Sequence, residues 1–186
     1  MKLCDCPLVS VRVPTYNSSK TVVETLDSIF DQTYQNIELI ISDDCSTDNT
    51  VEICREWMSA HKDRFVRTEL LTVEKNTGVS ANVNRADDAC QGEWIKGIAG
   101  DDVLLPDCVE TYVDYIHEHP NAICVFANVE VFGSDEKDRK YMEKYYSIEE
   151  EFFSWSIEEQ YDYITLEANR IPAATAFYNK AKVIEL

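Results

Sequence analysis

Residues 93–106 read Glu-Trp-Ile-Lys-Gly-Ile-Ala-Gly-Asp-Asp-Val-Leu-Leu-Pro, a short apolar run followed by two adjacent carboxylates and a proline. The apolar run predicts a buried strand, and Pro106 predicts the start of a helix. Asp101 and Asp102 therefore follow the carboxyl end of a strand. In open α/β sheets ligands bind beside these strand ends, and paired carboxylates favour a hard divalent cation. The stretch predicts a site for a metal ion and a nucleotide.

Both aspartates also have a simple structural explanation. Aspartate is common in the turn after a glycine such as Gly100, and it is common at the entry to a helix. Gly-Asp-Asp alone does not separate the two interpretations. The remaining sequence has to decide between them.

The rest of the chain alternates β-branched runs with segments of helical periodicity. Besides the strand before Asp101, strands are predicted at 8–13, 37–41, 70–73, 122–132 and 173–178. Apolar residues recur at helical spacing at 22–30, 51–58, 79–90 and 109–116, and a further helix begins at 179. This alternation predicts an α/β fold of three layers, with a mostly parallel central sheet and helices on both faces.

We expect residues 1–186 to form a single domain or most of one, since a hydrophobic content of 45% supports a sizeable core. Residues 133–146 are highly charged without an apolar period, which predicts a mobile surface loop. Residues 147–186 contain two capping-box patterns, Ser147 to Glu150 and Ser156 to Glu159, each followed by aromatic residues. They predict an added subdomain, whose aromatic residues either pack in its interior or form a wall that binds the acceptor.

The charge of the chain limits its partners. Lysine and arginine total 17 against 35 acidic residues, a net charge of -18, which repels nucleic acid and anionic lipid. A nucleotide diphosphate would then need a divalent metal for neutralisation. Seven cysteines among apolar residues suit a reducing compartment, and no apolar run reaches the length of a membrane span. We expect a chain that lies in the cytoplasm, with the inner membrane surface as an alternative location, and that has no nucleic acid partner.

Three polar clusters follow predicted strands, at residues 15–17, 43–44 and 101–102. Because the carboxyl ends of parallel strands share one edge of a sheet, we expect these clusters to converge on one crevice. There a buried Asp44 would accept a hydrogen bond from the imide N–H of uracil, while Tyr16 packs on the base. Alternatively, Asp43 or Asp44 caps the next helix, and Tyr16 is a half-buried aromatic residue.

Other enzyme classes lack support in the sequence. Neither Gly-x-Gly-x-x-Gly nor the P-loop pattern follows any predicted strand, which argues against dehydrogenases and kinases. The three histidines fall on predicted helices, so no Ser-His-Asp or Cys-His arrangement is indicated.

Four segments carry a resemblance. They read Val-Ser-Val-Arg-Val-Pro-Thr-Tyr-Asn (9–17), Ile-Ile-Ser-Asp-Asp-Cys-Ser-Thr-Asp-Asn-Thr (40–50), Asn-Thr-Gly-Val-Ser (76–80) with Asn84, and Ala-Gly-Asp-Asp-Val-Leu (99–104). In this order they resemble the successive motifs of family 2 inverting glycosyltransferases. The resemblance covers about the first 130 residues closely.

This resemblance implies a GT-A fold, a nucleotide-sugar donor that is commonly UDP-linked, a Mn or Mg cation, and a polysaccharide or lipid-linked acceptor. Residues 147–186 would begin the acceptor-side subdomain. Asp101 would face the ribose and diphosphate and Asp102 would bind the metal, with Asp101 as a second candidate ligand. The donor would be bound by the base-lining residues Pro14, Thr15 and Tyr16, by Asn17 in the same motif, by Asp44 at uracil, and by Asn76, Gly78 and Asn84.

The sequence departs from the family pattern in two places. Ala99 stands where many members carry an aspartate, which leaves only the adjacent pair for the metal. The family's general base is a carboxylate that would lie beyond Leu186, so the catalytic base is unknown and we expect an N-terminal part of a longer enzyme. A non-catalytic nucleotide-sugar binding module is the alternative.

Aromatic residues near Phe152 are a candidate contact surface for a homo-oligomer.

Overall fold

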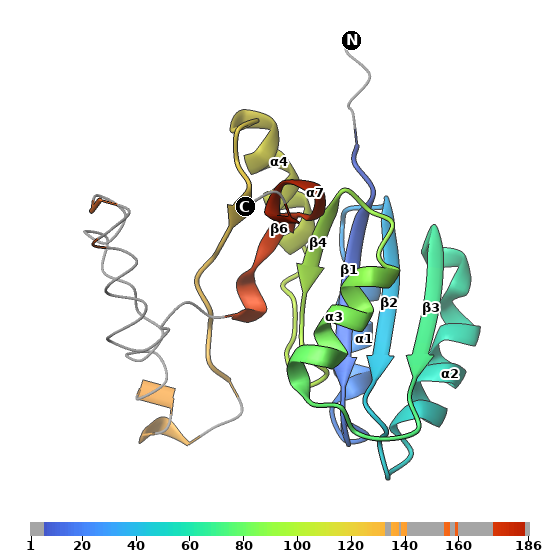
Figure 1. The fold of residues 1–186 in the computed structure, drawn as a ribbon. Helices are drawn as coiled ribbons and strands as arrows, with labels where there is room; N and C mark the ends of the chain where they lie inside the picture. Colours follow the sequence, from blue (N-terminus) through green and yellow to red (C-terminus); the bar gives the residue numbers. More distant parts are fainter. Residues whose placement is uncertain are drawn as a thin grey trace. The chain divides into compact units, whose positions relative to one another are not determined.

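The computed structural model describes residues 6–132, 135–137, 139–140, 155–156, 159 and 173–184. The chain divides into two compact units, Met1–Val125 with Phe177–Leu186, and Phe126–Ala176. All strands of the sheet lie in the first unit (Figure 1). In the part of the chain that is described, no helix has the length and apolar character needed to cross a membrane.

The sheet has six strands and is mostly parallel. Its spatial order is β3 (Arg67–Thr72), β2 (Ile37–Asp43), β1 (Val9–Thr15), β4 (Trp94–Gly97), β6 (Phe177–Asn179) and β5 (Cys124–Val125). The first four strands pair in parallel, whereas β6 runs antiparallel to both β4 and β5. The predicted α/β class is confirmed.

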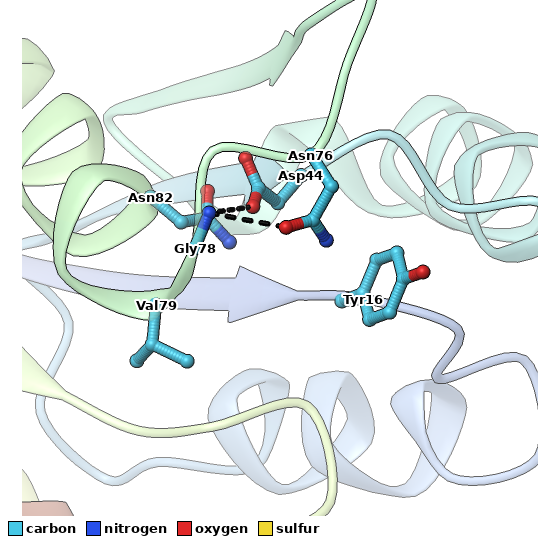
Figure 2. Close-up of a pocket in the computed structure, with 6 residues that line it drawn as sticks. All are labelled: Tyr16, Asp44, Asn76, Gly78, Val79 and Asn82. Atoms are coloured by element: carbon cyan, nitrogen blue, oxygen red, sulfur yellow. Dashed lines mark hydrogen bonds between the residues drawn. The ribbon is translucent and has the colours of Figure 1, made fainter.

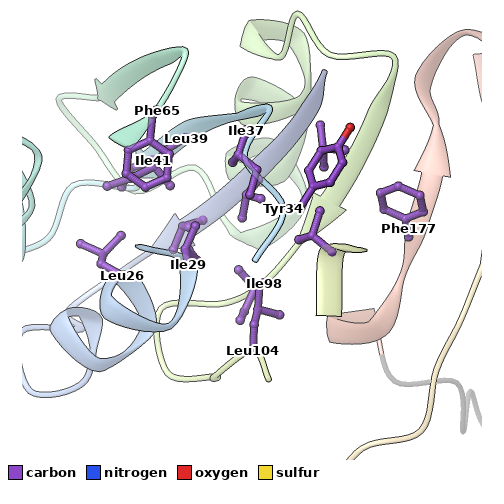
Figure 3. Close-up of a cluster of buried hydrophobic side chains, with 14 of the residues drawn as sticks. Leu26, Ile29, Tyr34, Ile37, Leu39, Ile41, Phe65, Ile98, Leu104 and Phe177 are labelled. Atoms are coloured by element: carbon purple, nitrogen blue, oxygen red, sulfur yellow. The ribbon is translucent and has the colours of Figure 1, made fainter. Parts of the chain in front are cut away.

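Helices cover both faces of the sheet (Figure 1). They are α1 (Val22–Phe30), α2 (Thr50–His61), α3 (Val79–Ala89), α4 (Cys108–Glu118) and α7 (Lys180–Ile184), with short 3-10 turns at Lys62–Arg64 and Ala173–Thr175. The larger core joins the sheet to α1, α2 and α4 (Figure 3), and the smaller one joins it to α3. Along β2, Leu39 and Ile41 face the larger core and Ile40 faces the smaller one, as the two-residue period of a strand requires.

Strand β1 continues two residues beyond its predicted end, through Pro14 to Thr15. Its pairing with β4 stops at Arg12, so at Pro14 the strand pairs only with β2. Proline is tolerated at such a local edge because its missing N–H is not needed there.

The strand predicted at 122–132 is wrong over most of its length. Only Cys124–Val125 pairs, because its neighbour β6 is three residues long and offers no further partner. Phe126 and Phe132 are 43% and 55% exposed. The strand predicted at 173–178 begins only at Phe177, after a 3-10 turn.

The capping box predicted at Ser156 is present. The backbone N–H and hydroxyl of Ser156 each donate to a Glu159 carboxylate oxygen at 2.8 Å, and Glu159 N donates back to the hydroxyl at 3.3 Å. The first capping box and Phe152 lie outside the described residues, as does most of 133–146. The loop at 133–146 and the subdomain at 147–186 therefore stay predictions, although Phe177–Leu186 belongs to the first unit.

The segment that starts at Phe177 is part of the sheet unit and bonds several of its elements. Strand β6 lies between β4 and β5, with Val125 directly opposite Phe177. Lys180 Nζ donates to Cys90 O at 2.8 Å, at the C-terminal end of α3. Lys182 Nζ donates to the carbonyl of Ala122 at 3.3 Å, after α4.

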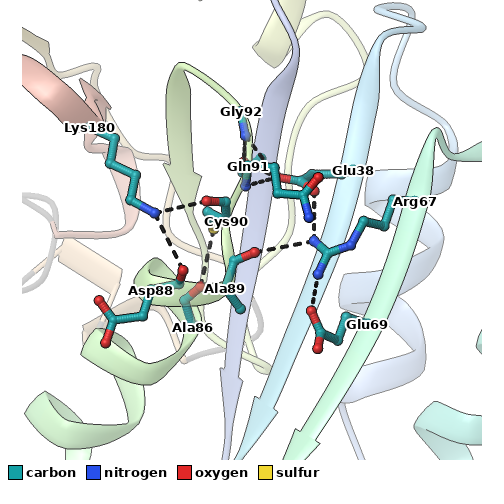
Figure 4. A network of polar contacts seen from close by, with 11 residues as sticks. Glu38, Arg67, Glu69, Ala86, Asp88, Ala89, Cys90, Gln91, Gly92 and Lys180 are labelled. Carbon is teal, nitrogen blue, oxygen red and sulfur yellow. Dashed lines mark hydrogen bonds and ion pairs between the residues drawn. The ribbon is translucent and has the colours of Figure 1, made fainter.

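A buried glutamate links the amino-terminal ends of β1, β2 and β3 (Figure 4). Glu38 on β2 has no exposed surface, and its carboxylate accepts hydrogen bonds from Ser10 Oγ on β1, from Arg67 Nη1 on β3 at 2.9 Å, and from the N–H groups of Gln91 and Gly92 at 2.5 and 2.9 Å. Burial raises the pKa of Glu38, but these bonds outweigh it and the net pKa is lowered. A Cβ at Gly92 would lie 2.6 Å from Leu8 O, so glycine is required there.

Replacing Glu38 by Gln should lower the free energy of unfolding by about 3 kcal/mol, because Arg67 loses its buried counter-charge. The stabilisation by Glu38 should be complete above its ordinary pKa of 4.5 and be lost as the pH falls through the lowered value. Urea unfolding from pH 7 to pH 3 measures both effects. The matched control is Glu69→Gln, since Glu69 also bonds Arg67 but is part-exposed; it should cost less than about 1 kcal/mol. Equal losses in the two variants would contradict the assignment.

Candidate functional site

The exits of β1 and β2 lie side by side. Thr15 pairs with Asp43 in register, and the Thr15 hydroxyl donates to Asp43 Oδ2 at 2.9 Å. The N–H of Asp44 then donates to Thr15 O at 3.0 Å. These hydrogen bonds hold the starts of the two loops that follow the strands next to each other.

Further hydrogen bonds join the two exit loops. Asn17, in the left-handed region at φ 53°, donates its N–H to Ser46 Oγ at 2.8 Å and accepts at Oδ1 from Thr47 N at 2.8 Å. Ser19 N donates to Asp48 Oδ2 at 3.2 Å. The side-chain oxygens of Thr15 and Asn17 thus bond protein groups, whereas the side chain of Tyr16 between them is 50% exposed.

The helix-capping alternative for Asp43 and Asp44 is wrong. Asp48 instead accepts from the N–H and hydroxyl of Thr50, the first residue of α2, at 3.0 and 2.5 Å. The hydrogen bond from the Thr50 hydroxyl is the largest cause that lowers the pKa of Asp48, which falls to about 2. Burial acts in the opposite direction and has a smaller effect. Asp43 accepts from Ser46 N at 2.8 Å, within the loop before the helix.

A pocket of about 280 Å³ lies at this edge of the sheet. Figure 2 shows its six lining residues, which come from the two strand exits and from the start of α3. They are Tyr16, Asp44, Asn76, Gly78, Val79 and Asn82. Val79 is 79% exposed, so the pocket combines a polar floor with an apolar rim.

The carboxylate of Asp44 is 2% exposed and is surrounded by donors. Oδ2 accepts from the N–H groups of Thr77 and Gly78 at 2.8 and 2.7 Å, and Oδ1 accepts from Thr77 Oγ1 at 2.6 Å and Arg85 Nη2 at 3.1 Å. Burial raises the pKa of Asp44, but the four bonds outweigh it and the net pKa is lowered. Asp44 is therefore an ionised group at neutral pH.

Gly78 sets the direction of the loop that faces Asp44. Its φ of 87° lies in the left-handed region that favours glycine. This turn aims the N–H of Gly78 at Asp44, and Asn76 Oδ1 accepts from the same N–H at 3.1 Å (Figure 2). Gly78 thus has a conformational reason to be glycine.

Two residues of this region, Asn82 and Arg85, were not predicted from the sequence. Asn82 is 3% exposed, donates to Thr15 O at 3.2 Å and accepts from Arg85 Nη1 at 3.0 Å. The predicted donor residue Asn84 is exposed and does not line the pocket. Helical spacing carried the missing signal, because Asn82 lies three residues after Val79 and Arg85 lies three residues after Asn82, which makes each residue a neighbour of the one before it on the helix surface.

Asp101 and Asp102 follow β4 and also lie outside this pocket. Because β1 lies between β2 and β4, they flank the β1 exit on the side opposite Asp44. Thr21 Oγ1 donates to Gly100 O at 2.7 Å, and a Cβ at Gly100 would lie 3.0 Å from Thr15 Cγ2. The structure therefore brings Tyr16, Asp44, Asn76 and Gly78 into one pocket and places Asp101 and Asp102 beside the same strand exit.

The electrostatics of Asp102 suit a cation. Burial raises the pKa of Asp102, and the neighbouring charge of Asp101 raises it further, whereas Lys96 acts in the opposite direction. Burial lowers the pKa of Lys96 to about 8. The described residues contain no cluster of three His, Cys, Asp or Glu side chains fit for a metal. Two adjacent carboxylates still fit Mg or Mn, since such ions in nucleotide sites take the remaining oxygens from phosphate and water.

The comparison with protein families identifies the chain. Residues 10–184 match the description "Glycosyl transferase family 2". The chain belongs to glycosyl transferase family 2.

Curated relatives carry names of the same class. The chain is 36% identical over 121 residues to chondroitin synthase of Escherichia coli, covering 64% of this chain and 17% of that protein. It is 38% identical over 131 residues to glycosyltransferase GlyG of Streptococcus pneumoniae, covering 70% and 41%. The chain thus spans less than half the length of these relatives.

Solved structures share the fold. S. aureus TarS in complex with UDP-GlcNAc superposes with a TM-score of 0.69 at 22% identity, over 95% of this chain and 46% of that one. The mannosyltransferase PcManGT of Pyrobaculum calidifontis, in complex with GDP-Man and Mn2+, gives 0.61 at 28% identity, over 66% and 35%. The expected GT-A fold is confirmed.

Replacing Asp44 by Asn should lower the free energy of unfolding by about 2 kcal/mol, because the new amide NH₂ faces groups that are all donors. The wild-type stabilisation should be full above the ordinary pKa of 3.8 and be lost as the pH falls through the lowered value. Urea unfolding measures it. The same substitution at exposed Asp101 should change stability by less than about 0.5 kcal/mol. An unchanged Asp44→Asn protein would refute the role given to this carboxylate.

Proposed function

We propose that the chain is the donor-binding part of an inverting glycosyltransferase that moves a sugar from a UDP-sugar to a polysaccharide or lipid-linked acceptor. The observation that carries the proposal is the pocket holding Tyr16 and an ionised, buried Asp44, at the same strand exit as Asp101 and Asp102. Ligands in open α/β sheets bind at such strand ends.

The pocket suits a pyrimidine base. The half-exposed ring of Tyr16 offers an aromatic face for stacking, and Asp44 offers an acceptor for the imide N–H of uracil. Asn76 and Gly78 close the polar side of the pocket. Four further predicted donor residues do not line the pocket and stay predictions, namely Pro14, Thr15, Asn17 and Asn84.

Asp102, with Asp101 beside it, would hold a Mn or Mg ion against the donor diphosphate. When bound, such an ion stabilises the negative charge that develops on the leaving diphosphate. The two carboxylates would hold the ion beside the β1 exit. The Mn2+ recorded with GDP-Man in PcManGT supports this part of the proposal.

Inverting transfer forms a bond between the acceptor hydroxyl oxygen and the anomeric carbon as the bond to the diphosphate breaks. The hydroxyl attacks from the face opposite the diphosphate, and its proton passes to a general base. No residue of this chain is assigned as that base. Five described cysteines are free thiols, which supports placing the protein in the cytoplasm; they are Cys45, Cys54, Cys90, Cys108 and Cys124.

Calorimetric titration of the chain with UDP, with and without Mn, tests the proposal. UDP should bind more tightly with Mn, and Asp102→Ala should remove most of the difference, because the cation loses its main ligand. Asp107→Ala is the matched control, since Asp107 is an exposed acid shortly after the pair; it should behave as wild type. Equal UDP affinity in the presence and absence of Mn would remove the metal role and favour a binding module. Absence of any UDP binding would overturn the proposed function.

A further inference from the structure

The acceptor capacity of Asp44 is already filled by the protein. An ionised carboxylate offers about four lone-pair sites. All four are used here, two by the N–H groups of Thr77 and Gly78 and two by the Thr77 hydroxyl and Arg85. An imide N–H entering the pocket therefore has to replace one of these donors.

Three of the four donors are fixed in place. The N–H groups of Thr77 and Gly78 belong to the backbone turn that the left-handed Gly78 creates. Arg85 is held by further bonds from Nη1 to Ser42 Oγ at 3.1 Å and to Asn82 Oδ1 at 3.0 Å. Replacing any of these would require backbone movement or the loss of several bonds together.

The hydroxyl of Thr77 is the donor that can leave most easily. Thr77 is exposed, and its hydroxyl turns away from Asp44 by rotation about single bonds. It also lines a second, open hollow of about 560 Å³ with Val73, Glu74 and Lys75, which gives the side chain room to rotate. The same oxygen accepts from Arg85 Nη2 at 2.7 Å, so in the free protein it closes a ring of bonds around Asp44.

We propose that the Thr77 hydroxyl is an internal competitor of the nucleobase: it occupies Asp44 Oδ1 in the free protein and gives up that position to the imide N–H of the bound base. This rests on the proposed function, because it takes Asp44 as the base-binding residue. Thr77 thereby sets the affinity for the donor without being a ligand of it. The exchange conserves the number of hydrogen bonds at Asp44 and leaves no buried acceptor unpaired.

Thr77→Val tests the proposal, because valine keeps the shape of threonine and removes the hydroxyl. Calorimetric titration should show UDP binding about fivefold tighter than to wild type, the effect of removing one competing hydrogen bond. Thr77→Ser keeps the hydroxyl and should bind UDP as wild type does. Thermal unfolding of each variant first establishes that it folds.

A second ligand separates exchange at the imide from a general loosening of the loop. N3-methyl-UDP lacks the imide N–H, so its affinity should not increase in Thr77→Val. A gain for UDP alone supports the proposal. An equal gain for both ligands, or no gain for UDP in a folded Thr77→Val protein, overturns it while leaving the proposed function intact. A wild-type chain that binds no UDP overturns both.

Discussion

The backbone hydrogen bond from Asp44 N to Thr15 O, together with the side-chain bond from Thr15 to Asp43, fixes the exits of the two central strands against each other. Two polar residues that line the pocket, Asp44 and Asn82, each bond the backbone carbonyl of Thr15. This junction sets the position of Asp44, which in turn holds the turn at Gly78 and the side chain of Arg85. The pocket that contains Asp44 therefore depends on strand register more than on any single loop.

Sequence patterns were sufficient for the layers and for most elements, because strand and helix periods report burial directly. They also placed Tyr16, Asp44, Asn76 and Gly78 at strand ends or loops, where they meet in one pocket. The ends of the strands depend on which residues find a partner strand, and sequence periodicity does not report this. Residues 126–132 are apolar enough for a strand but have no strand partner, since β6 runs antiparallel and begins only at Phe177.

Side-chain partners were much harder to anticipate. Thr15 and Asn17 were predicted to bind the donor, yet their side-chain oxygens bond neighbouring protein groups. The four donors around Asp44 come from two distant segments, and only the left-handed turn at Gly78 brings two of them into place. A motif identifies which residue types gather at a site, but the loop conformation decides which of their lone pairs remain available.

The direct pairing of Val125 with Phe177 has a consequence for the segment between them. The intervening 126–176 unit leaves and re-enters the sheet at adjacent strands, so its two ends are a neighbouring-strand spacing apart. Because the β5–β6 pairing fixes both ends of this segment, a change in its length does not by itself require a change in sheet register. The β1 and β2 exits lie on other strands of the sheet.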